Sequence, residues 1–119
     1  MYADLPYSFA KLDDLMERAG IDVLLVTSKH NTQYLLGGYR FIFFSAMDAI
    51  GHSRYLPVIA YVKGAPDKTA YVANKMEAGE HANHPLWPQH FLPMSWGSVD
   101  SITEAIRHVK GHGPASPRI

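Results

Sequence analysis

Apolar side chains recur every three or four residues in two stretches of the chain, which is the spacing of an amphipathic helix. The first stretch follows Ser8, a good N-cap, and ends at Gly20, which can adopt the left-handed conformation that stops a helix. The second stretch spans residues 98–110. We expect Asp100 or Ser101 to cap it and Gly111 to close it.

Shorter apolar segments lie between these helices. Residues 21–27 are too few and too β-branched for a helix, so they predict a central strand buried on both faces, with Val23 and Leu25 in the core. The other strand-like segments share β-branched or aromatic residues between turn signals: 39–44, 54–62, 69–73 and, less regularly, 90–92.

Turns and short helices complete the pattern. Ser28 or Asn31 begins a short helix that ends at Gly37 and Gly38, residues 63–68 form a turn rich in glycine and proline, and residues 76–83 form one or two helical turns. The order of elements predicts an α/β domain in which helices pack on a mixed sheet.

Composition narrows the class of protein. The chain has 119 residues, which suggests a single domain, and its 11 basic residues balance 11 acidic ones. Because a neutral chain has no electrostatic surface for a polyanion, we expect no nucleic-acid partner. The sequence has no apolar run long enough for a membrane span and no signal-peptide pattern at its start. The absence of cysteine excludes disulfides and thiolate zinc sites and fits a cytoplasmic location.

Seven histidines raise the question of a metal site. His81, His84 and His90 match no ligand spacing, and Pro85 ends any helix that His81 and His84 could share, so a solvated surface is expected there. His108 and His112 are four residues apart, but adjacent glycines place them at a fraying helix end. No nucleophile elbow, phosphate loop or dinucleotide motif is present, so the sequence assigns no catalytic residue and no metal ligand.

The densest apolar feature is the aromatic run 39–44. In an extended strand Tyr39 and Phe43 lie on one face, and Arg40 and Phe44 lie on the other. Two interpretations stay open. The run is either a core strand buried on both faces, or its end leaves the core and offers aromatic side chains to a ligand or a partner chain.

The first forty residues resemble a known family. The segment from Gly20 to Ser28, GIDVLLVTS, and the segment from Asn31 to Gly37, NTQYLLG, are similar to the N-terminal domain of the creatinase and prolidase family. That family includes Xaa-Pro dipeptidases, aminopeptidase P and creatinase. Leu36 stands where the family usually has Thr or Ser, and Gly38 adds a second glycine.

The resemblance implies a three-layer α/β domain of ribonuclease H-like topology over residues 1–119. It also implies that catalysis belongs to a C-terminal "pita-bread" domain outside this chain, which holds two divalent metal ions with two Asp, one His and two Glu. No cofactor is therefore expected in this chain. The family's N-terminal domain has one more strand after its last helix, and that strand would begin near Arg118.

The resemblance also suggests partners. In creatinase-type members, the loop after the Tyr-Leu-x-Gly motif sends an aromatic residue and an Arg toward the neighbouring subunit's active site. By offset, Phe43 matches the aromatic residue and Ser45 stands at the Arg position, which favours a dipeptidase-like parent over creatinase. Tyr39, Arg40, Phe43 and Phe44 are therefore the expected substrate- or partner-adjacent residues.

The expected function is that of a non-catalytic domain that contacts its own catalytic domain and a second subunit, in a homodimer, and walls the partner's active site. Two alternatives are a free-standing small-ligand or regulatory binding module of the same fold and a histidine-based metal-binding protein. Self-association is expected through an open sheet edge or the aromatic run, since zero net charge does not oppose it.

Overall fold

The structure is a computed structural model that describes residues 5–39, 41 and 57–119. The predicted strand over 39–44 and the connecting loop after it lie almost wholly outside these residues. The elements follow the chain in this order: α1 (Phe9–Ala19), β1 (Val23–Val26), α2 (Lys29–Leu35), β2 (Val58–Val62), β3 (Ala65–Asn74), the 3₁₀ turn η2 (Lys75–Glu77), α4 (Ala78–Asn83), β4 (His90–Ser95) and α5 (Ser98–His112).

The sheet is mixed, with the strand order β1-β2-β3-β4. β1 pairs with β2 and β2 with β3 in antiparallel fashion, whereas β4 runs parallel to β3. Within the described residues β1 lies at an edge, so the prediction of a central position for it is wrong there. The apolar run correctly indicates that both faces of β1 are covered, since Val23 and Val26 belong to core clusters on opposite faces of the sheet. Coverage of both faces does not determine whether a strand has one neighbour in the sheet or two.

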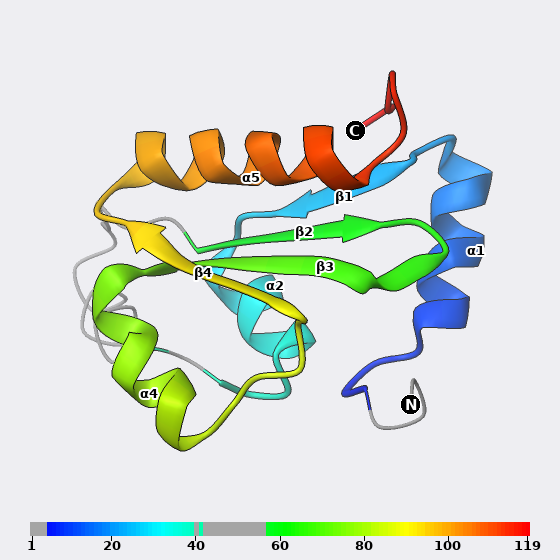
Figure 1. Ribbon diagram of the computed structural model, residues 1–119. Helices are drawn as coiled ribbons and strands as arrows, with labels where there is room; N and C mark the ends of the chain where they lie inside the picture. The colour runs from blue at the N-terminus through cyan, green and yellow to red at the C-terminus, as the bar shows by residue number, and fades with distance from the viewer. Residues whose placement is uncertain (1–4, 40, 42–56) are drawn as a thin grey trace.

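Helices cover both faces of this sheet, as Figure 1 shows, and the three-layer expectation is confirmed. α5 packs on one face, where Ala105 and Val109 meet Val58, Val72 and their neighbours. α2 and α4 lie on the opposite face. Strand alternation assigns side chains to the two faces, so in β4 His90 and Leu92 point toward α5 while Phe91 packs with Tyr71 on the other side.

The first helix is held at the end of the sheet by Asp13. One of its carboxylate oxygens accepts hydrogen bonds from the hydroxyl of the fully buried Tyr61, at 2.6 Å, and from the backbone N–H of Gly64, at 3.0 Å. Both predicted caps of α1 are confirmed: Ser8 accepts from the Lys11 N–H, and Gly20 is left-handed at φ +71°.

The turn between β2 and β3 is shorter than predicted. It consists of Lys63 and Gly64, and β3 already begins at Ala65. Gly64 has φ +76°, so it closes the hairpin in two residues, and Pro66 falls where the pairing of the two strands shifts register. Pro57 directly precedes β2, as expected of a residue without an N–H to donate.

The last helix differs from its prediction at both ends. Gly97 is the N-cap and no side chain caps the helix, because Asp100 accepts from the Trp96 N–H and Ser101 bonds to Ser95. Gly111 does not close α5, which continues to His112 with Gly113 as its C-cap. The chain then returns to β1, where the Arg118 carbonyl accepts from the N–H groups of Asp22 and Val23 at 2.7 and 3.1 Å. The resemblance places the start of a further strand at this point.

None of the helices in the described residues is both long and apolar enough to cross a membrane.

Candidate functional site

Of the four predicted partner-adjacent residues, the structure describes one. Arg40, Phe43 and Phe44 lie outside the described residues. Tyr39 follows the left-handed Gly37 and Gly38, and its half-buried ring packs edge-on against Tyr71 with centroids 6.3 Å apart. At this position its hydroxyl points toward the interior of the domain, where it donates to Glu77.

Glu77, the last residue of η2, carries a fully buried carboxyl group. Its Oε1 accepts hydrogen bonds from the hydroxyls of Tyr39 and Tyr71, both at 2.7 Å, and its Oε2 accepts from the Asn74 N–H at 2.7 Å. Asn74 and Glu77 form a capping box over η2. Burial raises the pKa of Glu77, and the three donated hydrogen bonds oppose that rise. The spacing Asn-x-x-Glu is a signal in the sequence that could have identified this residue.

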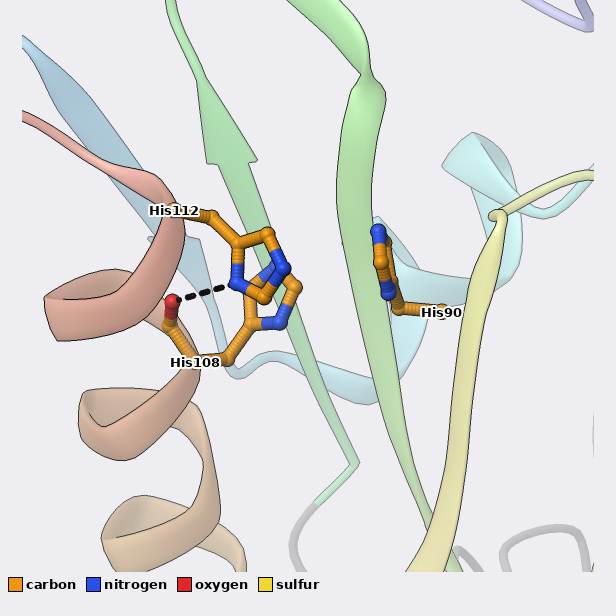
Figure 2. A group of neighbouring side chains, drawn as sticks. All are labelled: His90, His108 and His112. Carbon is orange, nitrogen blue, oxygen red and sulfur yellow. Dashed lines mark hydrogen bonds between the residues drawn. The ribbon is translucent and has the colours of Figure 1, made fainter.

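A second polar cluster lies on the opposite face of the sheet, under the end of α5 (Figure 2). His108 and His112 come from the last turns of α5, and His90 is the first residue of β4. The ring centroids of His108 and His112 are 4.1 Å apart and nearly parallel, and His90 lies 4.8 and 4.7 Å from them. One ring nitrogen from each residue lies within 4.8 Å of the others.

Backbone carbonyls fix the tautomers of two of these rings. His108 Nε2 lies 2.7 Å from the Lys68 carbonyl, and His112 Nδ1 lies 3.0 Å from the His108 carbonyl. Because a carbonyl only accepts, each of these nitrogens carries a hydrogen and donates it. The other nitrogen of each ring, Nδ1 of His108 and Nε2 of His112, therefore has a free lone pair when the ring is neutral.

Burial lowers the pKa of His108, and the neighbouring His112 and His90 rings lower it further, whereas the hydrogen bond to Lys68 opposes them. The lowered pKa favours the neutral form of His108. The neutral form is the one that presents a lone pair.

The histidine cluster was missed in the sequence because α5 was expected to end at Gly111. Because α5 continues to His112, His108 and His112 lie about one turn apart on the same helix and on the same face of it. His90 was grouped with His81 and His84, but the structure separates them. His81 accepts from the Leu86 N–H and stacks on Phe91 on the other side of β4, and His84 is exposed at the end of α4.

An apolar surface lies where β4 ends and α5 begins. We call it the β4–α5 corner and define it by its exposed apolar side chains, Met76, Met94, Trp96 and Val99. Trp96 is 53% exposed and Val99 is 78% exposed. The ammonium of Lys75, in η2, sits 5.6 Å from the Trp96 ring centroid and joins the two sides of the corner. The corner adjoins β4, an edge of the described sheet.

The architecture defines a mixed α/β domain in which helices flank a four-stranded sheet. A comparison with protein families is consistent with it: residues 9–119 match the Creatinase/Prolidase N-terminal domain. The chain belongs to this family, as its resemblance indicated. A search of curated proteins found no match.

Proposed function

We propose that this chain is the non-catalytic N-terminal domain of an Xaa-Pro dipeptidase-like metallopeptidase. The observation that carries the proposal is the family match over residues 9–119. The ligand set expected of the family's catalytic domain is rich in carboxylates and binds two metal ions. Within the described residues, the only convergent group of three or more such ligand types consists of histidines alone. The two-metal chemistry is accordingly assigned to the expected catalytic domain.

The proposed role of the domain is to contact a second subunit and to form part of the wall around the partner's active site. The β4–α5 corner supports this role, because it carries four exposed apolar side chains on elements that contact one another, and apolar surface patches mark interaction sites. Trp and Met are also residue types that are enriched in protein interfaces. Tyr39 and the segment after it stay the predicted partner-adjacent residues.

The alternative is a free-standing binding module of the same fold. The reading frame downstream of Ile119 separates the two. A following domain with two Asp, one His and two Glu as metal ligands supports the proposed function, whereas a stop codon directly after Ile119 supports the module.

The purified chain is expected to have no peptidase activity. The test is hydrolysis of Xaa-Pro dipeptides with added Mn²⁺, Zn²⁺ or Co²⁺, with an active prolidase as the positive control. Hydrolysis that depends on metal, co-purifies with the chain through two chromatographic steps and disappears when the three clustered histidines are replaced would contradict the proposal. It would place catalysis in this domain.

The chain is expected to self-associate weakly, since an isolated domain retains only part of an interface that needs about 1,200 Å² to be stable. Sedimentation velocity at several concentrations measures this association. Trp96→Ser should weaken it if the β4–α5 corner is the contact, and Phe43→Ser should weaken it if the aromatic run is. Leu15→Ser is the matched control, because Leu15 is half exposed on α1. A single monomeric species up to high micromolar concentration contradicts the expected subunit contact.

A further inference from the structure

We propose that His90, His108 and His112 bind one divalent transition-metal ion of the zinc type, with solvent at the fourth position. The site is independent of the two-metal centre expected in the catalytic domain. It also goes beyond the proposed accessory function, which needs no metal in this domain.

The first support for the proposal is the placement of the three imidazole rings. Two of the ligands are one helical turn apart on α5, and the third projects from β4 on the face that α5 covers. One ring nitrogen from each histidine lies within 4.8 Å of those of the other two. Zinc–nitrogen bonds of about 2.0–2.1 Å in a tetrahedron place the nitrogens about 3.3 Å apart. A change of rotamer at the partly exposed His90 would bring its nitrogen closer to the other two, while the hydrogen bonds of His108 and His112 stay in place.

The second support for the metal site is the hydrogen bonding of the rings. Histidines that bind metals almost always donate their other N–H to a carboxylate, a carbonyl or water, which fixes the tautomer and orients the ring. His108 and His112 each donate to a backbone carbonyl, at 2.7 and 3.0 Å. Nδ1 of His108 and Nε2 of His112 are thereby left as the nitrogens that can accept a metal.

The chemistry of the donors sets the class of ion. The cluster contains three imidazoles and no carboxylate. Imidazole suits Zn²⁺, Cu²⁺ and Ni²⁺, whereas Mg²⁺ and Ca²⁺ require oxygen ligands. Three protein ligands leave a position open for water.

The competing explanation is that the three rings only pack. Nearly parallel rings 4.1 Å apart are a favourable contact by themselves, and a buried histidine needs no more than the hydrogen bond from His108 to Lys68. The two explanations differ in one measurable respect, because packing requires no metal and gives no saturable binding.

Isothermal titration of the metal-stripped chain with Zn²⁺ tests the site, on protein purified without a polyhistidine tag. We expect one Zn²⁺ per chain and a melting temperature that rises with Zn²⁺ concentration, since a ligand that binds the native state stabilises it. We also expect Co²⁺ to bind with the visible absorption of a tetrahedral complex. Mg²⁺ and Ca²⁺ should not bind.

Substitutions then locate the ion. His90→Gln and His112→Gln change partly exposed residues, so both variants should fold, as circular dichroism would show. Each should weaken Zn²⁺ binding by more than the 10–100-fold that loss of an outer hydrogen-bond partner typically costs. His30→Gln and His84→Gln are the matched controls, because both side chains are exposed and lie outside the cluster. Their affinity for Zn²⁺ should equal that of the unaltered chain.

Three outcomes overturn the proposal. The first is the absence of saturable Zn²⁺ binding, which leaves the rings as packing only. The second is binding that His90→Gln and His112→Gln leave unchanged. The third is binding that the control variants weaken as much as the cluster variants do, which would indicate unspecific coordination by surface histidines.

Discussion

Replacing Glu77 by alanine is expected to lower the free energy of unfolding by about 3–5 kcal/mol, which is a large part of the stability of a domain this size. The carboxylate accepts three hydrogen bonds in the interior, from the Tyr39 and Tyr71 hydroxyls and the Asn74 N–H. Its removal leaves all three donors without their acceptor, and each unsatisfied buried group costs about 1–3 kcal/mol. Urea denaturation followed by circular dichroism measures the change.

Glu80→Ala is the matched control. Glu80 lies in α4, three residues after Glu77, and its side chain is exposed. Its replacement should therefore change the free energy of unfolding by less than about 0.5 kcal/mol. Equal losses in the two variants would show that Glu77 has no special place in the interior.

The pH dependence of stability gives a second readout of Glu77. Because burial raises the pKa of Glu77 in the folded chain, the native state binds this proton more tightly than the unfolded state does. Its contribution to stability is therefore fully present below the ordinary pKa, 4.5, and is lost as the pH rises through the folded pKa. Glu77→Gln should lack this decline, so its destabilisation should be greatest at acid pH.

Replacing Val23 by aspartate is expected to prevent folding at neutral pH. Val23 is fully buried in the cluster that joins β1, β2, β3 and α5. A charge placed there without a partner costs several kcal/mol against a total stability of about 5–15 kcal/mol. The variant should lose its cooperative thermal transition and its dispersion in a proton–nitrogen correlation spectrum.

Val99→Asp is the control, since it makes the same chemical change at a side chain that is 78% exposed. Val99 lies in the first turn of α5, where the helix dipole favours an acidic group, so this variant should fold normally. Leu25→Asp should fall between the two, because Leu25 is only partly buried against the same core. A cooperatively folded Val23→Asp protein would contradict the position of β1.

The sequence determined the elements whose signals are local. Ser8 and Gly20 define α1 through a side-chain cap and a left-handed stop, and Ser28 caps α2 in the same way. The hairpin of β2 and β3 follows from two apolar runs around a glycine turn. The motifs between Gly20 and Gly37 were enough to indicate the family to which the chain belongs.

Tertiary structure decided whatever depends on residues distant in sequence. A glycine does not always end a helix, because its unfavourable helix propensity is only about 1 kcal/mol. Val109 packs against the sheet, and α5 continues past Gly111 to His112. The parallel register of β4 on β3, with His90 beside Ala70, then brings His90 under that last turn. Glu77 likewise receives one of its three hydrogen bonds from Tyr39, 38 residues away in the sequence. The spacing Asn-x-x-Glu indicates only the local cap formed by Asn74 and Glu77. The histidine cluster and the two tyrosine hydroxyls on Glu77 are formed by contacts between separate elements, which local spacing does not reveal.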